Sequence, residues 1–178
     1  MATDWLLCSY RLPREPSRLR LAIWRRVKRL GAILLHDTFW VLPADAKTRE
    51  DFDWLAEEIE ERGGSVMVWE ARSGPSMQDA EVIRRFRADA DQRYADLARA
   101  AARLLKMTTR RPLTPARLEP ARQQLRLLER TLRLERRRDY FRASGRQAAE
   151  AALRAAAKAL GIGFKTTTAT GRTHALGD

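Results

Sequence analysis

The sequence predicts an α+β fold, with a small sheet domain followed by a basic helical extension. Short apolar segments alternate with helical segments up to residue 69, and helical periodicity alone continues from residue 76 to residue 160. All five tryptophans lie before residue 70, which indicates a packed core in that part of the chain. The net charge is +2 over residues 1–107 and +10 over residues 108–178, which indicates a polar second part.

The first domain is predicted over residues 1–73 and contains four strands and two helices. We expect the strands at residues 5–11, 33–35, 39–42 and 66–69. The first helix has Ser17 as its N-cap and ends at Gly31, and the second opens with a capping box of Thr48 and Asp51. The order β-α-β-β-α-β is that of a ferredoxin-like fold, in which four antiparallel strands carry two helices on one face.

The second part is predicted over residues 74–161 and is helical. A long helix, capped by Ser76 with Asp79, runs to about residue 106. A linker at residues 108–115 and two further helices follow. Residues 162–178 lack periodicity, and we expect them to form a disordered tail.

The composition excludes several classes of protein. No run of 18 apolar residues could span a membrane, and the N-terminus does not resemble a secretory signal. The single cysteine, Cys8, cannot form an internal disulfide, and we expect a buried thiol. No catalytic motif or metal-ligand spacing is present, and His36-Asp37 indicates a turn. We therefore expect a cytoplasmic protein without enzymatic activity, cofactor or metal.

The first helix is strongly basic. Residues 11–30 hold eight basic side chains and one acid, Glu15, so their net charge is +7. One interpretation is a helix that contacts phosphates, because Lys and Arg side chains displace counterions from nucleic acid. The alternative is neutralisation by the acidic second helix, with Arg25 and Arg29 among the paired residues. We expect about half of the charge of the first helix to be paired in this way.

The extension carries a second basic segment. Residues 108–142 contain eleven arginines and four acids, and arginine suits bidentate phosphate contacts. The alternatives are a solvated face of a helix pair and a surface for an acidic protein. Tyr140 and Phe141 could stack on bases, but we favour a role in anchoring the helix end in a small core. The residues predicted to contact phosphates in DNA are Arg18, Arg20, Arg25, Arg26, Lys28, Arg29, Arg122, Arg126, Arg136, Arg137 and Arg138.

Three sequence blocks resemble a known family. They read WLLCSYRLPREPSRLRLAIWRRVKRLGAILLHDTFWVLP, REDFDWLAEEIEERGGSVMVWEARS and RRRDYFRASGRQAAEAAL. These blocks are similar to the N-terminal domain of ChrB, a family of bacterial chromate-resistance regulators. The resemblance covers residues 4–160 and implies a transcription regulator of a chromate-efflux operon. Full-length members carry a further chromate-response domain, which we expect this chain to lack.

The same resemblance implies kinship with the repressor PaaX and with a CRISPR adaptation nuclease. The related PaaX domain is ferredoxin-like. The nuclease has an acidic residue at the end of its first strand, where this chain reads Cys8-Ser9-Tyr10-Arg11. We therefore do not expect metal-dependent cleavage.

The residues and the resemblance leave three hypotheses. The first is a DNA-binding regulator of the chromate-resistance type. The second is a non-catalytic interaction module, in which the sheet pairs with a copy of itself and the extension docks an acidic partner or a separately encoded sensor protein. The third and weakest is direct binding of the chromate oxyanion at the helix N-terminus near Ser17 and Arg18.

Overall fold

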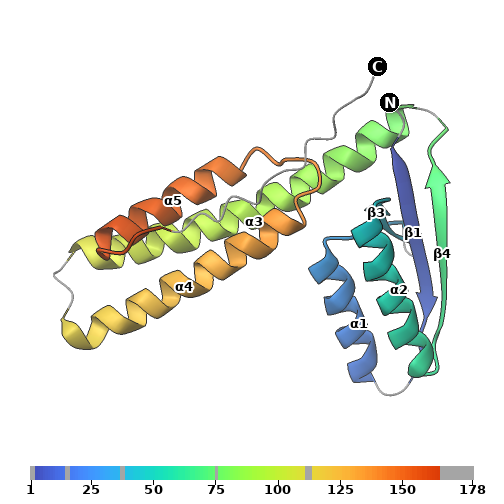
Figure 1. Cartoon of the computed structure of the whole chain (residues 1–178), viewed down its shortest axis with the longest axis horizontal. Coiled ribbons are helices and arrows are strands. Elements are labelled where there is room, and N and C mark those ends of the chain that lie inside the picture. The colour runs from blue at the N-terminus through green and yellow to red at the C-terminus, as the bar shows by residue number, and fades with distance from the viewer. Residues whose placement is uncertain (1–2, 15–16, 37–38, 75, 111–113, 165–178) are drawn as a thin grey trace. The chain divides into compact units, whose positions relative to one another are not determined.

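The computed structural model in Figure 1 describes residues 3–14, 17–36, 39–74, 76–110 and 114–164. It confirms the α+β class, with four strands followed by a mainly helical second part. The elements in chain order are β1 (Asp4–Arg11), α1 (Ser17–Leu30), β2 (Ile33–Leu35), β3 (Phe39–Pro43), α2 (Ala46–Glu61), β4 (Ser65–Arg72), α3 (Ser76–Arg110), α4 (Pro115–Arg137) and α5 (Arg146–Ala159).

The chain divides into two compact units. The sheet unit consists of Met1–Tyr94 and Arg133–Arg146, and the helical unit consists of Ala95–Leu132 and Gln147–Asp178. The boundary predicted at residue 73 falls inside the sheet unit, because the first part of α3 packs on the sheet.

The sheet has the strand order β2-β3-β1-β4, and all neighbouring strands are antiparallel. Leu6 of β1 lies opposite Leu42 of β3 and Glu70 of β4, so these three side chains share one face. Arg49 of α2 forms an ion pair with Glu70, which places α2 on this face. Figure 1 shows α1 and α2 together on one side of the sheet. Leu6 and Leu42 are buried.

On the opposite face of the sheet, the region around Trp5 is covered by aromatic residues from distant parts of the chain. The ring of Trp5 stacks on Phe86 of α3 with the centroids 5.9 Å apart, and it contacts Phe141 at 5.8 Å. Tyr140 meets the ring of Phe86 edge-on at 6.0 Å. This cluster confirms that Tyr140 and Phe141 anchor the helix end in a core. It also accounts for the place of residues 76–94 in the sheet unit.

Helix α2 begins with a capping box one turn earlier than predicted. Asp45 is the N-cap, and its carboxylate accepts a hydrogen bond from the backbone N–H of Thr48 at 2.8 Å. The backbone N–H of Asp45 donates in return to the Thr48 hydroxyl at 3.0 Å. Thr48 is fully buried and donates to the Pro43 carbonyl at 2.6 Å, which joins β3 to α2. The predicted box of Thr48 with Asp51 is wrong, because Thr48 occupies the third helical position; Asp51 instead pairs with Lys47.

Asp79 ties the start of α3 to the sheet. Its side chain is buried and accepts hydrogen bonds from the Ser73 hydroxyl, from Trp5 Nε1 at 2.7 Å and from the Thr3 backbone N–H at 3.1 Å. The hydrogen bond from Ser73 lowers the pKa of Asp79 most, and those from Trp5 and Thr3 lower it further, so the pKa lies below its usual range. The sequence predicted Asp79 as a capping partner of Ser76, whose side chain lies outside the described part of the chain. The contacts of Asp79 with Trp5 and Thr3 are tertiary.

The helical unit consists of the end of α3, most of α4 and α5. Its core is built from small and aliphatic side chains at helical spacing: Leu97, Ala101, Leu104, Leu125, Leu153, Ala156 and Ala157. Helix α3 continues to Arg110 rather than ending near residue 106, so the linker is shorter than predicted. Residues 111–113 of that linker and 165–178 of the predicted tail lie outside the described residues.

Candidate nucleic-acid interface

Three arginines form a stripe along the outer side of α1. Arg18, Arg25 and Arg29 are exposed, and their separations of seven and four residues place them on one side of the helix. At a rise of 1.5 Å per residue they span about 16 Å along α1. The opposite side of the helix is buried in the core and consists of Leu19, Ile23 and Val27. We call Arg18, Arg25 and Arg29 the α1 arginine stripe.

Two other basic residues of α1 are paired with acids. Arg26 Nη1 lies 3.0 Å from Glu58 of α2, and Lys28 Nζ lies 3.8 Å from Asp89 of α3. Among the described residues these are the ion pairs that α1 makes, so the pairing expected for Arg25 and Arg29 is not formed there. The reason is their position around the helix: Arg26 lies beside α2, whereas Arg25 and Arg29 are turned away from the sheet.

The outer side of α2 is acidic. Its exposed residues at helical spacing are Glu50, Asp53, Glu57 and Glu61. Helices α1 and α2 pack side by side on the same face of the sheet (Figure 1), so this face has a basic half and an acidic half. A polyanion would be attracted to α1 and repelled by α2, which restricts how it can approach.

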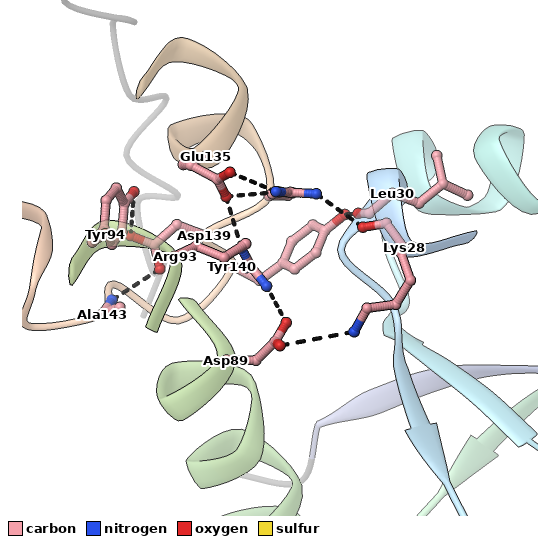
Figure 2. Close-up of polar contacts among 10 residues, drawn as sticks. Lys28, Leu30, Asp89, Arg93, Tyr94, Glu135, Asp139, Tyr140 and Ala143 are labelled. Atoms are coloured by element: carbon pink, nitrogen blue, oxygen red, sulfur yellow. Dashed lines mark hydrogen bonds and ion pairs between the residues drawn. The ribbon is translucent and has the colours of Figure 1, made fainter. Parts of the chain in front are cut away.

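The C-terminal end of α1 is held by side chains from a segment 110 positions later in the chain. Arg138 Nη1 donates to the Lys28 carbonyl at 2.9 Å, and the Tyr140 hydroxyl donates to the Leu30 carbonyl at 2.7 Å (Figure 2). The last carbonyls of a helix have no partner within the helix, and these two side chains supply one. The chain then turns at Gly31, whose φ of 84° favours glycine. The end of α1 that carries Arg29 is therefore anchored.

Arg138 also belongs to a buried ion cluster. Glu135 is 5% exposed and accepts hydrogen bonds from Arg138 Nη2 at 2.5 Å and from Arg93 Nε at 2.7 Å (Figure 2). Arg93 pairs in addition with Asp89, which faces Lys28. The Arg138 side chain is only 12% exposed and is paired with Glu135, so it is not part of the basic surface.

Two contacts of this cluster were not expected from the sequence: Glu135 as the partner of Arg138, and Arg93 as the second partner of Glu135. One signal could have found Glu135: it continues the helical spacing of Leu125, Leu128 and Leu132 along α4, a side of the helix where an acid needs a partner. The local sequence marks Arg93 only through Asp89, four residues before it, because Glu135 is reached only by folding.

A second polar contact orders the turn after α4. Asp139 accepts a hydrogen bond from the Tyr94 hydroxyl at 3.1 Å and another from the Ala143 backbone N–H at 2.8 Å (Figure 2). Burial raises the pKa of Tyr94, so its hydroxyl keeps the proton that it donates. The segment that holds α1 is thus itself fixed to α3.

The remaining predicted phosphate contacts have different surroundings. Arg20 is exposed, and its Nη2 donates to the Arg14 carbonyl at 2.9 Å. Arg137 is exposed, whereas Arg136 is partly buried and has contacts of its own. In the helical unit, Arg126 pairs with Glu119 at 2.6 Å, and Arg122 is partly buried.

Metal-binding side chains do not gather in the described part of the chain. It holds no group of three or more His, Cys, Asp or Glu that could bind a metal ion. Cys8 is fully buried, and burial raises the pKa of its thiol to about 12. His36 lies in the turn after β2 with a φ of 49°, and Asp37 lies outside the described residues. Of the helices described, none is long and apolar enough to cross a membrane.

The fold and this surface define a small α+β domain that presents a cationic helix. A family model described as Protein ChrB, N-terminal, matches residues 20–164, and the chain belongs to this family. This confirms the resemblance seen in the sequence. The chain is also similar to Protein ChrB of Cupriavidus metallidurans, with 32% identity over 94 residues. That match covers 53% of this chain and 28% of the relative. No solved structure matches the chain significantly.

Proposed function

We propose that this chain is the DNA-binding part of a chromate-resistance regulator, and that the α1 arginine stripe contacts DNA phosphates. Membership of the ChrB family supports the regulatory role. The observation that carries the DNA contact is the stripe itself, because three exposed guanidinium groups lie on one side of a helix. Arg20 and Arg137 are exposed in the same unit and are further candidates.

The surroundings of the stripe support a phosphate ligand. Arginine forms bidentate hydrogen bonds with phosphate oxygens, and it keeps its charge at any physiological pH. The acidic side of α2 directs a polyanion onto α1 and away from the rest of the helix face. The anchored C-terminal end of α1 means that Arg29 is presented by an ordered helix, so binding does not have to order the backbone.

DNA binding can be tested by fluorescence anisotropy with a labelled duplex from the promoter of the chromate-efflux operon. Each phosphate contact contributes about −0.9 to the slope of log K against log salt concentration, so the three stripe residues predict a slope near −2.7 or steeper, about one unit per contact. A duplex of equal length and unrelated sequence is the control for specificity. Absence of binding even at low salt would contradict the proposal.

The regulatory role is tested separately in cells. Deleting the gene should change the transcript level of the chromate-transporter gene of the host when cells are exposed to chromate. An unchanged transcript would contradict the regulatory role without bearing on DNA binding by the isolated chain.

Self-association is a second candidate function, and the charge division of the helix face favours it. A two-fold axis would place the basic α1 of one copy against the acidic α2 of another, and the reverse pair would form by symmetry. Trp54 on the outer side of α2 and Trp24 on α1 are 57% and 48% exposed and would add apolar contact. This association would use the same arginines as DNA.

Complementary charge reversal distinguishes the two candidates. One variant carries Arg25→Glu with Arg29→Glu, and the other carries Glu57→Lys with Glu61→Lys. For a two-fold dimer, sedimentation should show each variant alone as a monomer and their mixture as a dimer, because only the mixture has opposite charges on the facing helices. A wild-type chain that stays monomeric at low salt and high concentration would rule out self-association and leave DNA binding as the function of the stripe.

A further inference from the structure

A cavity of about 600 Å³ lies in the sheet unit between the end of β1 and the first half of α1. It is lined by Tyr10, Arg11, Leu12, Arg20, Leu21 and Trp24. Its volume falls in the range of pockets that hold small molecules, about 300–1,000 Å³. The cavity is on the flank of α1, beside the α1 arginine stripe, and none of the three stripe residues lines it.

The apolar part of the cavity is a surface that the core leaves uncovered. Trp24 is 48% exposed and Leu21 is 46% exposed, although the core-facing residues of α1 are buried almost completely. Half-exposed large apolar side chains side by side in a hollow are a common mark of a binding site. A flat ring could stack on the Trp24 indole and cover Leu21.

The polar part of the cavity is positively charged. Arg11 and Arg20 supply two guanidinium groups, and no acid is among the lining residues that the structure describes. The hydrogen bond from Arg20 Nη2 to the Arg14 carbonyl orients one of these groups and leaves its other nitrogens able to donate. Burial raises the pKa of Tyr10, so its hydroxyl is neutral at physiological pH.

We propose that this cavity binds a small organic anion with a flat apolar body, such as an aromatic carboxylate, sulfonate or phosphate. The ring of the ligand lies against Trp24 and Leu21, and its anionic group faces Arg11 and Arg20. A bare tetrahedral oxyanion would satisfy the arginines but would leave the apolar wall uncovered. This site does not depend on DNA binding, and its ligand is recognised in the absence of nucleic acid.

The test uses two fluorescent probes that share their rings and differ in charge. 1-Anilinonaphthalene-8-sulfonate carries a sulfonate, and N-phenyl-1-naphthylamine has the same aromatic body without it. The anionic probe should bind the folded chain at least about tenfold more tightly, because a hydrogen bond to a charged group contributes about that factor. Equal affinity for the two probes would overturn the proposal. At matched ionic strength, sulfate should displace no more of the anionic probe than chloride does. If sulfate displaces more of the probe than chloride, the site is a simple oxyanion site and the proposal is overturned.

Variants locate the site. Trp24→Ala should lower the affinity for both probes. Arg11→Gln with Arg20→Gln should lower only the affinity for the anionic probe, to a value close to that of the neutral probe. The matched controls are Trp54→Ala, an exposed tryptophan on α2, and Arg29→Gln, an exposed arginine of α1 outside the cavity. Unchanged binding in Trp24→Ala, or equal loss in the controls, would place the probe elsewhere and overturn the proposal. Circular dichroism of each variant shows whether it is folded.

Discussion

Arg138 donates a hydrogen bond from Nη1 to the backbone carbonyl of Lys28 at 2.9 Å, across 110 positions of sequence. The same guanidinium donates to Glu135 at the end of α4, and Glu135 in turn accepts from Arg93 of α3. Arg138 and Glu135 together therefore join the ends of α1 and α4 to α3. Arg138 therefore has a different role from the three arginines of the α1 arginine stripe. Those of the α1 arginine stripe face solvent, and Arg138 holds the helix that presents them.

Replacing Arg138 by Ala should destabilise the protein by about 3–5 kcal/mol, because it leaves the buried Glu135 carboxylate short of one partner and removes one of the two donors to the Lys28 carbonyl. Arg138→Lys keeps the charge but not the forked geometry and should fall between Ala and wild type. Urea unfolding followed by circular dichroism measures the change. Arg137→Ala, one position away and exposed, should stay within about 0.5 kcal/mol of wild type. Equal effects at the two positions would show that the buried cluster does not stabilise the fold.

Gly31→Ala should destabilise the protein by about 1 kcal/mol or more. Its φ of 84° disfavours any side chain, and an added Cβ would lie 2.8 Å from the Cβ of Arg138. Gly74→Ala is the matched control, since nothing lies within 4 Å of a Cβ built there. Thermal unfolding of the two variants checks this. The same melting temperature for both would mean that the turn after α1 accommodates a side chain.

Asp79 should make stability depend on pH on the acid side. Hydrogen bonds from Ser73, Trp5 and Thr3 lower its folded pKa below the unfolded value of 3.8. The stabilisation is therefore fully present above pH 3.8 and is lost as the pH falls through the folded pKa. Melting temperatures of wild type and Asp79→Asn from pH 7 down to pH 2 should converge in acid. Parallel curves with a constant gap would contradict this role of the Asp79 charge.

Cys8 should be unreactive in the folded protein. Its side chain is fully buried, and burial raises the pKa of the thiol to about 12, so the thiolate is scarce at pH 8. A colorimetric disulfide reagent should modify it slowly in buffer and promptly in concentrated urea. Similar rates in the two conditions would show that β1 opens readily.

Neutralising the α1 arginine stripe should weaken DNA binding and its salt dependence together. Arg18→Gln, Arg25→Gln and Arg29→Gln in one variant should make the salt slope less negative by about 2.7, roughly 0.9 for each lost phosphate contact. Arg84→Gln is the control, because Arg84 is exposed on α3 of the same unit and is paired with Glu81. A slope that does not change in the triple variant would move the interface away from α1.

The site is predictable from sequence where its geometry is local. Helical spacing places Arg25 and Arg29 opposite Ile23 and Val27, and the structure has the first pair exposed and the second buried. The pairing of Arg25 and Arg29 with α2 was expected and is not formed among the described residues, because it depends on how two helices turn toward each other. The capping residue of α2 was missed for a related reason, since the turn from Pro43 to Asp45 decides where the helix starts.

The sequence by itself determined the α+β class, the order of the elements and the family, because apolar periodicity and glycine-bounded turns are properties of neighbouring residues. Only the tertiary structure decided which arginines remain available to a ligand. Arg137 and Arg138 are adjacent and alike in sequence, yet one is exposed and the other is neutralised by Glu135. That difference arises from the packing of α4 against Lys28 and Arg93, which are contacts between segments far apart in the chain.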